Sequence, residues 1–456
     1  MLKKISDTCV KIVQNLLPDA FIFCIILTIV VFIFAMPAAH ATPLQVINFW
    51  GSNVWSLLAF SMQMALVLVL GTAMANAPAV KRLLAKIAGA AKSPSSGIVL
   101  VTVVATIASW LNWGFGLVVG ALLAKEIARK VQGVDYRLLI ASAYSGFVLW
   151  HAGLSGSIPL QIASVNETVT QQTAGVITES IPLTETVLAP WNLIVCLVIL
   201  ILMPLVNAKM HPAPQDTVTI DPKLLVDDEV VDMKATTIAE KLENSRILSL
   251  FIVVVGVIYL VQYFISSGSV LNSLSLNIVN LIFLLIGVLL HGKPINYVRA
   301  ISAAAKGAGG IILQFPFYAG IMGMMTGHLP DSTASLAGVI SNFFVSISNQ
   351  ITFPVWTFLS AGIVNFFVPS GGGQWAVQAP IVLPASVEVG VSPALACMGI
   401  AWGDQWTNML QPFWALPALG IAGLGARDIM GYCVVDLILT GIVAIVGFIV
   451  VGMMGF

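Results

Sequence analysis

The chain has 456 residues, of which 58% are hydrophobic and only 9% are charged. A soluble domain has too little interior to bury this much apolar surface, so the composition indicates an integral membrane protein. The formal net charge is zero, which gives no support for a nucleic-acid partner. The five cysteines show no CxxC or zinc-like spacing, so we interpret them as packing residues and expect no structural metal and no cofactor.

The N-terminal stretch allows two interpretations. Lys3, Lys4 and Lys11 precede an apolar run at 20–35 and a small-residue motif at 39–41, a pattern typical of signal peptides. The leader before the apolar run is long and contains a proline and an aspartate. We therefore predict a retained first span, with a cleaved signal peptide as the alternative.

Nine apolar stretches have close to the roughly 20 residues that a helix needs to cross a bilayer. They lie at 18–36, 53–76, 138–165, 190–206, 246–265, 276–290, 301–328, 393–420 and 432–454. Two further stretches, 96–124 and 352–389, do not fit a simple span. The first lies between Lys92 and Lys125, and if both flanks are cytoplasmic it must enter and leave on one side.

The stretch 352–389 has an interruption in its middle, the sequence NFFVPSGGGQW at 365–375. Glycine costs roughly 1 kcal/mol and proline roughly 3 kcal/mol inside a helix, so we predict a break from Pro369 to Gly373. Both stretches are therefore predicted to be re-entrant hairpins. Backbone without helical hydrogen bonds is tolerated at membrane depth only where protein buries it or it lines a cavity, so the hairpin tips are candidate binding sites.

Nine crossings and two hairpins place the N-terminus in the cytoplasm and the C-terminus in the periplasm. All 20 lysines and arginines then lie on the inner side, and the outer segment 166–189 carries only acidic charges, as the positive-inside rule requires. We predict an all-α polytopic membrane protein of the bacterial inner membrane.

The two halves of the chain resemble each other. Residues 1–206 form a first predicted repeat, 207–245 a polar cytoplasmic linker, and 246–456 a second repeat. Asn112 lies 253 residues before Asn365, and each follows an apolar helix and precedes a glycine-rich break. Their hairpins open to opposite sides, and inverted repeats with discontinuous helices are typical of secondary transporters.

Each predicted repeat also contains a helix with a polar, glycine-containing break. The breaks are at 150–159 in the helix 138–165 and at 402–412 in the helix 393–420. We expect the site between the two hairpin tips and these two breaks. Gln63 and Gln314 occupy matching places in the two repeats, where each either lines the path or bonds a neighbouring helix.

Amide groups at half-helix ends and polar side chains suit a carboxylate, while carbonyl and side-chain oxygens suit Na⁺. The predicted substrate-binding residues are Asn112, Gly114, Gly116, Ser155, Ser157, Asn365, Ser370, Gly371, Gly372, Gly373, Gln374, Trp406 and Asn408. The predicted cation- or proton-coupling residues are Asp404, Thr407, Asn112, Asn365 and Gly156, with Na⁺ near Asp404. The alternative for each glycine is close helix packing.

Asp404 is interpreted as the only acidic side chain in the middle of a predicted span. An intramembrane carboxylate is costly and usually functional, either as a cation ligand or as a proton carrier, with a structural cap or pair as the alternative. His151, at the equivalent break, is interpreted as a hydrogen-bonded packing residue, with proton transfer as the alternative. The tryptophans at the breaks are interpreted mostly as packing or interface residues, with Trp375 or Trp406 as the candidate wall of a small apolar pocket.

The same motifs resemble the bacterial short-chain fatty acid transporter family. Among the matching stretches are NWGFGLVVGALLAKEIARKV at 112–131, NFFVPSGGGQWAVQAP at 365–380 and QPFWALPALGIAGLGARDIMGYC at 411–433. The resemblance covers nearly the whole chain, which argues against cleavage at Ala41, and it implies inner-membrane uptake of acetoacetate, butyrate or similar acids. It also implies a two-hairpin fold whose members are often elevator-type dimers, so a homodimer is expected. His151 departs from the family's glycine-rich pattern, so the resemblance implies no obligatory proton relay there.

Together these features predict a symporter of a small monocarboxylate with Na⁺ or H⁺ in the lipid bilayer, not an enzyme. A cation/proton antiporter of the same architecture is one alternative. An intramembrane acyl-processing enzyme is another, with His151 and Ser155 as its nearest base and nucleophile. The coupling ion, the stoichiometry, the preferred acid and the tip that holds the carboxylate stay open.

Overall fold

The computed structural model describes residues 8–13, 15, 18–165, 167–225, 236–268 and 275–455. All regular secondary structure in these residues is helical, which confirms the predicted all-α class. The elements are α2 (Ala20–Ala38), α3 (Pro43–Asn53), α4 (Leu58–Ala75), α5 (Pro78–Ala88), α6 (Pro94–Leu111), α7 (Trp113–Lys130), α8 (Tyr136–Ser145), η1 (Gly146–Leu149), α9 (Ser157–Ala163), α10 (Glu167–Gln172), η2 (Leu183–Glu185), α11 (Pro190–Lys209), η3 (Pro214–Asp216), η4 (Pro222–Leu225), α12 (Ile238–Glu243), α13 (Arg246–Ser267), α14 (Leu276–His291), α15 (Pro294–Ala305), η5 (Lys306–Ala308), α16 (Gly309–Thr326), α17 (Leu336–Ser346), α18 (Phe353–Phe367), α19 (Gly371–Val389), α20 (Pro393–Thr407), α21 (Leu416–Ala422) and α22 (Ala426–Met454).

Within the described residues, six helical segments are long and apolar enough to cross a membrane. Helices α3 and α4, bent by 47° at a short break, make a seventh if they form one span. The predicted span at 276–290 corresponds to the shorter apolar helix α14. The protein is therefore multi-pass, while the count of nine crossings and their orientation stay predictions.

The first predicted hairpin consists of α6 and α7, which join at Asn112. Its arms lie antiparallel, because Gly97 faces Ile127 at one end and Gly116 faces Ser109 at the other. A Cβ added to Gly116 would overlap the backbone of Ser109. This glycine therefore permits close packing of the two arms, which is the alternative that the sequence left open for it.

The second hairpin consists of α18 and α19, and its break is shorter than predicted. Only residues 368–370 are non-helical, and Gly371, Gly372 and Gly373 form the first turn of α19. The prediction of a break extending to Gly373 is wrong because Ser370 caps the new helix: its hydroxyl accepts a hydrogen bond from the Gly373 N–H at 3.3 Å. Capping satisfies one of the N–H groups that a helix start leaves unpaired.

The predicted breaks overlap turns between helices only in part, because 157–159 belong to α9 and 402–407 to α20. The chain leaves α8 through η1 and a turn before α9 begins at Ser157, and it leaves α20 through a turn before α21 begins at Leu416. Helix α18 packs along α20 in parallel, since Gly399 faces Thr357 and Gly403 faces the carbonyl of Phe358. Because of this close contact, the second hairpin lies beside the second predicted break.

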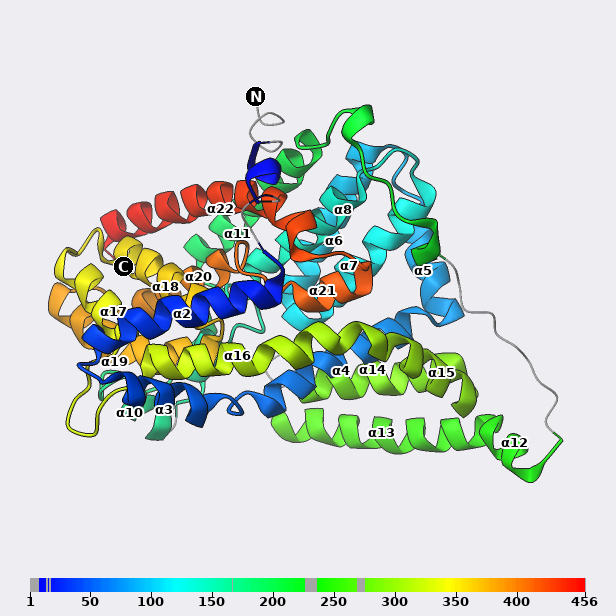
Figure 1. Ribbon diagram of the computed structural model, residues 1–456, viewed down its shortest axis with the longest axis horizontal. Coiled ribbons are helices and arrows are strands. Elements are labelled where there is room, and N and C mark those ends of the chain that lie inside the picture. The colour runs from blue at the N-terminus through cyan, green and yellow to red at the C-terminus, as the bar shows by residue number, and fades with distance from the viewer. Residues whose placement is uncertain are drawn as a thin grey trace.

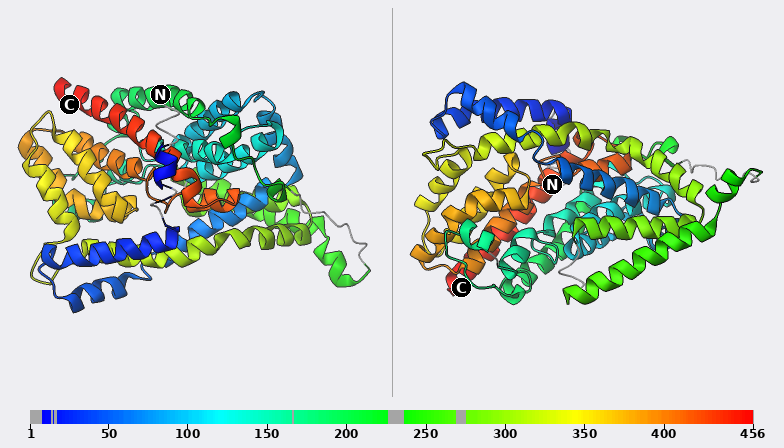
Figure 2. Two further views of the ribbon diagram at one scale, coloured as in Figure 1. Left: turned by 45° about the horizontal axis from the view of Figure 1, so that its top comes forward. Right: turned by 90° about the horizontal axis from the view of Figure 1, so that it is seen from below.

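Figure 1 shows two groups of helices. Helices α2, α4 and α13–α16 lie together along one side, and α6–α8, α18, α20 and α22 lie on the other, an arrangement that the left view of Figure 2 repeats. The two predicted repeats are interleaved, because α2 packs on α16, α4 on α14 and α11 on α22. The repeat boundaries and the inverted symmetry stay predictions.

Two features were not anticipated. Helices α3, α5 and α17 lie where the sequence predicted loops or ends of spans. The start of the predicted linker is packed against α8, where the Asp135 carboxylate accepts a hydrogen bond from the Val218 N–H at 2.9 Å. Residues 226–235 of the predicted linker lie outside the described residues.

Candidate functional site

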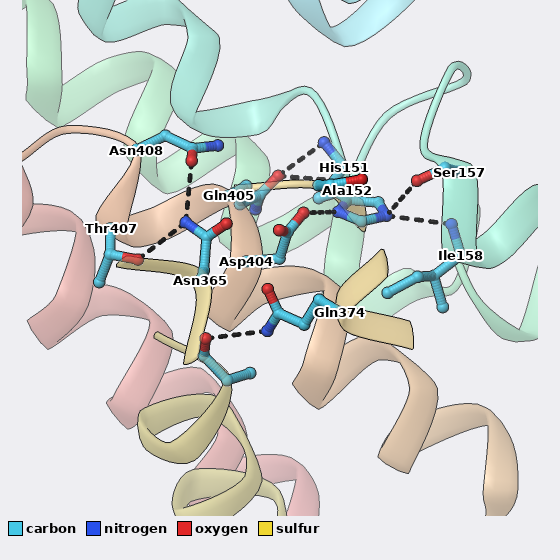
Figure 3. Close-up of polar contacts among 12 residues, drawn as sticks. His151, Ala152, Ser157, Ile158, Asn365, Gln374, Asp404, Gln405, Thr407 and Asn408 are labelled. Carbon is cyan, nitrogen blue, oxygen red and sulfur yellow. Dashed lines mark hydrogen bonds and ion pairs between the residues drawn. The ribbon is translucent and has the colours of Figure 1, made fainter. Parts of the chain in front are cut away.

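The tip of the second hairpin meets the first break. A Cβ added to Gly371 would lie 2.8 Å from Cε1 of His151 and would overlap the hydroxyl of Ser157. Only glycine allows this approach of the α19 N-terminus to the turn before α9. Figure 3 shows the polar side chains that gather there from both halves of the chain.

His151 and Asp404 form a fully buried pair at the centre of this junction. The distance from Nδ1 of His151 to Oδ2 of Asp404 is 2.5 Å. The Ile158 N–H donates to Nε2 of the same ring at 3.0 Å. A nitrogen that accepts from a backbone N–H cannot carry a hydrogen, so His151 is the neutral tautomer with its hydrogen on Nδ1, and it donates to Asp404.

Gln405 fixes the backbone of the first break. Its Oε1 accepts hydrogen bonds from the N–H groups of His151 and Ala152, at 2.8 Å and 2.9 Å. Backbone N–H groups only donate, so the orientation of this amide is determined. Its Nε2 is buried and has no partner among the described residues.

Asn365 links the second hairpin to the end of α20. Its Nδ2 donates to the hydroxyl of Thr407 at 2.9 Å and to Oδ1 of Asn408 at 2.8 Å. The single hydroxyl hydrogen of Thr407 is donated to the Gly362 carbonyl at 2.8 Å, so Thr407 must accept from Asn365. This leaves Oδ1 of Asn365 and Nδ2 of Asn408 unpartnered within the described residues.

Gln374 lies in the first turns of α19 and points toward Asp404 (Figure 3). Its Nε2 donates to the Ala361 carbonyl at 2.8 Å and to Oε1 of Gln378 at 2.9 Å. A carbonyl oxygen can only accept, so the group facing Ala361 must be the Nε2 of Gln374. The Oε1 of Gln374 points away from Ala361 and has no partner among the described residues.

The site therefore presents two kinds of unpartnered, buried polar atoms. Oxygens are supplied by Asn365, Gln374 and Asp404, and N–H donors by Gln405 and Asn408. In Figure 3 the side chains of Asn365, Gln374 and Asp404 point toward one another. Leaving such a group without a partner costs about 1–3 kcal/mol, so this arrangement is suited to a ligand that binds both oxygens and N–H groups.

At the tip of the first hairpin the predicted polar side chains are bonded, whereas the buried indole Nε1 of Trp110 has no partner among the described residues. Asn112 caps α7 by accepting from the Phe115 N–H at 3.1 Å, and Ser155 accepts from the Trp113 N–H at 3.0 Å. Gly114 is buried in the same first turn of α7. Thus Asn112 and Ser155 lie at the same tip, as the sequence predicted, with their side chains committed to backbone groups.

The remaining predicted residues have these surroundings. Gly156 lies against the carbonyl of His151, and Ser157 lies with its hydroxyl 3.1 Å from Nε2 of His151. A Cβ on Gly372 would meet nothing closer than Gln161, at 3.8 Å, and one on Gly373 would lie 2.8 Å from Met322. The indole of Trp406 donates to the Leu437 carbonyl of α22 at 2.7 Å.

An aromatic cluster borders His151 on its other side. Trp150 stacks on the imidazole at a centroid distance of 4.1 Å, and Trp150 also packs on Phe147 and Trp414. The ring centroid of Trp113, at the first hairpin tip, lies 5.2 Å from that of Trp414. We call Trp113, Phe147, Trp150 and Trp414 the aromatic cluster.

Sequence reasoning missed two features of the polar interior. Asp436, in α22, is fully buried as Asp404 is, and it lies near the start of its predicted span rather than in the middle. Its signal was present, because Asp436 lies inside the predicted span 432–454. Gln378 was also missed; it donates to Ser341 and Ser360 at 3.1 Å each and supports Gln374.

Gln63 and Gln314 do not have matching surroundings. Gln63 donates to Asn277 of α14 at 2.9 Å, so it bonds a neighbouring helix. Gln314 is buried in α16, and its Oε1 has no partner among the described residues.

Comparison with known proteins gives a consistent result. Residues 1–451 match the family described as short chain fatty acid transporter. A protein of Escherichia coli (strain K12) named for short-chain fatty acid transport is 46% identical over 450 residues, covering 98% of this chain and 99% of its own. A protein of the same name from Haemophilus influenzae is 45% identical over 455 residues, covering 98% and 99%. The YdaH transporter of Alcanivorax borkumensis is structurally similar at a TM-score of 0.41 and 15% identity, over 94% of this chain and 98% of that one.

Proposed function

Because the chain belongs to the short-chain fatty acid transporter family, we propose that it takes up short-chain fatty acids such as acetoacetate and butyrate by symport with Na⁺ or H⁺. The inner bacterial membrane is the proposed location, with the N-terminus in the cytoplasm and the C-terminus in the periplasm. The observation that carries the proposal is the set of unpartnered atoms at the second hairpin tip.

The unpartnered oxygens suit the coupling cation, and the unpartnered N–H groups suit the carboxylate of the acid. The oxygens of Asn365, Gln374 and Asp404 are the ligand type that a hard cation prefers, and a proton on Asp404 would serve the same purpose in proton coupling. The N–H groups of Gln405 and Asn408 suit a carboxylate. Binding both ions together offsets the large cost of removing either charge from water.

The aliphatic tail of the acid is proposed to contact the aromatic cluster rather than Trp406. Trp150 stacks directly on His151, whereas Trp406 packs on Gly362 and Gly441 of α18 and α22. Burying a methylene contributes roughly 0.8 kcal/mol, so a tail of about three methylenes gives only weak selection by length.

The burial of the site supports alternating access. Asn365, Gln374 and Asp404 are all 0% exposed, so an ion reaches them only when the hairpin tip moves away from His151. Helices α6–α8, α18 and α20 are in one group of elements, and α2, α4 and α13–α16 form another (Figure 1). We propose that the first group moves against the second, in an elevator-type cycle, and that the working unit is a homodimer.

The experiment is uptake of labelled butyrate into proteoliposomes under imposed Na⁺ and proton gradients. Accumulation that follows at least one inward gradient is expected. Uptake indifferent to both gradients would refute symport. Cation-driven proton flux without any butyrate dependence would favour the antiporter instead.

One geometric feature favours a second candidate, an acyl-processing enzyme. Asp404, His151 and Ser157 stand in the order of a Ser-His-Asp triad, with distances of 2.5 Å and 3.1 Å. However, a neutral imidazole has one lone pair, and the Ile158 N–H already donates to it at 3.0 Å, so His151 is poorly placed to take a proton from Ser157. Ser155, the nucleophile predicted from sequence, instead accepts from Trp113. Incubation with a butyryl ester should therefore give no hydrolysis above that of empty liposomes.

A further inference from the structure

Asp436, in α22, is a fully buried carboxyl group outside the candidate site. Its neighbour Asn207 of α11 contacts Thr102 of α6 and Ser145 of α8, and all of these residues are 0% exposed. Within the described residues no ion pair reaches Asp436. Its charge balance must therefore come from hydrogen bonds or from a proton.

Counting hydrogens gives one complete arrangement of this cluster. The hydroxyl of Thr102 donates to the Ile98 carbonyl at 2.7 Å, and that of Ser145 to the Ser142 carbonyl at 3.0 Å. Each hydroxyl has one hydrogen, so both oxygens accept from Nδ2 of Asn207, at 3.3 Å and 3.0 Å. The amide oxygen of Asn207 then lies 2.7 Å from Oδ1 of Asp436. Two oxygens at this distance need a hydrogen between them, so Asp436 carries a proton in this arrangement.

Turning the Asn207 amide over gives a second complete arrangement with the heavy atoms in the same places. Nδ2 then donates to Oδ1 of Asp436 at 2.7 Å, and the amide oxygen accepts from the hydroxyls of Ser145 and Thr102 at 3.0 Å and 3.3 Å. All groups are satisfied again, but Asp436 is now an ionised carboxylate. The two arrangements differ by one proton.

We propose that Asp436 and Asn207 form a proton-binding site in which the amide turns over as the carboxyl gains or loses its proton. On loading, a proton from water forms the Asp436 O–H bond, the carboxylate charge is neutralised, and the two hydroxyls turn to their backbone carbonyls. Release reverses each step. This inference deepens the proposed symport, and rests on it, by making the proton a coupling ligand.

The distance between the two oxygens fits a shared proton. At 2.7 Å they are at the normal length of an O–H···O hydrogen bond. The titratable side chains that face Asp436 are Cys433 on its own helix and, next to Cys433, Tyr144 of α8; α6 and α11 contribute Thr102 and Asn207, which do not titrate.

The cluster is connected to the candidate site through adjacent residues. Tyr144, next to Ser145, donates its hydroxyl hydrogen to the Asn408 carbonyl at 2.7 Å. Leu437, next to Asp436, accepts from the Trp406 indole at 2.7 Å. Both contacts reach the end of α20, the helix that carries Asp404, so the Asp436 cluster and the candidate site share a structural connection.

Infrared difference spectra of the full-length protein in lipid vesicles, recorded against pH, test the site directly. The C=O band of a buried protonated carboxyl group should titrate in the wild type, be lost in Asp436→Asn, and persist in Asp404→Asn. If Asp436→Asn does not fold, Asp436→Glu keeps the acid and should shift the band. A spectrum unchanged by both Asp436 variants would overturn the proposal, as would the absence of any titrating band in the wild type.

A transport measurement separates this inference from the proposed function. Asp436→Asn should lose the acceleration of butyrate uptake by an inward proton gradient, while exchange of labelled for unlabelled butyrate continues. Uptake that is still accelerated by an inward proton gradient in Asp436→Asn would refute proton coupling through Asp436, even if symport is real. Wild-type uptake that ignores both gradients would refute symport itself, whatever the spectra show at Asp436.

Discussion

The tips of the two hairpins are built by the same device, a polar residue that caps the returning helix, yet they differ in what remains to be bonded. At the first tip, Asn112 and Ser155 each accept from a backbone N–H, and Leu154 donates to the Trp110 carbonyl at 2.8 Å. Around the second tip, Asn365, Gln374 and Asp404 keep oxygens without partners in the described residues. This difference between the polar side chains of the two tips supports the proposal that the second tip binds the cargo and the first stabilises the site.

The same contrast separates two asparagines that look equivalent in sequence. Asn112 forms the break between α6 and α7, whereas Asn365 lies within α18 and bonds Thr407 and Asn408 of the broken helix. The residue that occupies the position of Asn112 at the second tip is Ser370. Changes at these positions should therefore have effects of different kinds.

The largest effect is expected from Asp404→Asn. The amide keeps the shape and still accepts from His151, but it lacks the charge that a cation or proton requires. Hydrogen bonds to charged groups contribute about 1.5–3 kcal/mol, so coupling should weaken by on the order of 100-fold and gradient-driven accumulation should disappear. Labelled butyrate uptake in proteoliposomes measures this. Asp331→Asn, in an exposed loop, is the control, and accumulation at the wild-type level in Asp404→Asn would show that Asp404 is structural.

The next effect is expected at the contact between the second tip and the first break. Gly371→Ala places a Cβ 2.8 Å from His151, whose ring is held by Asp404 and Ile158, so we expect about 1–3 kcal/mol of destabilisation from overpacking together with reduced transport. Gly372→Ala, one residue further, meets only Gln161 at 3.8 Å and should be close to neutral. Thermal unfolding in detergent compares the two. Equal effects would mean that the tip does not depend on its contact with His151.

Much of this architecture could be predicted from local chemistry. The proline and the glycines at 369–373 predicted a break in the helix. The isolated carboxyl group of Asp404 predicted a polar centre within an apolar helix. The extent of the second break could not be predicted from propensity, because the capping hydrogen bond of Ser370 lets Gly371–Gly373 begin a helix. The partners of His151 could not be predicted from the sequence either, because Asp404 lies 253 residues away along the chain.

Asp436 was missed for a different reason. It lies near the start of an apolar stretch, where a carboxyl group would ordinarily reach water, and only the packing of α22 against α11 and α8 buries it. Burial of this kind depends on long-range contacts. The sequence pattern therefore predicted which side chains were polar, but not which of them would keep unbonded atoms.

The smallest and most discriminating effect is expected from a pair of asparagine substitutions. Asn365→Ala removes an unpartnered oxygen and the bonds to Thr407 and Asn408, and we expect the concentration for half-maximal cation activation to rise about tenfold, equivalent to about 1.4 kcal/mol. Asn112→Ala removes a helix cap, which costs about 1 kcal/mol of stability, and should leave that concentration unchanged. Cation titrations of uptake and thermal unfolding, performed on both variants, distinguish the two roles. If Asn112→Ala instead weakened cation activation as much as Asn365→Ala, the two tips would both bind, and the symmetric site expected from the sequence would replace the asymmetric one.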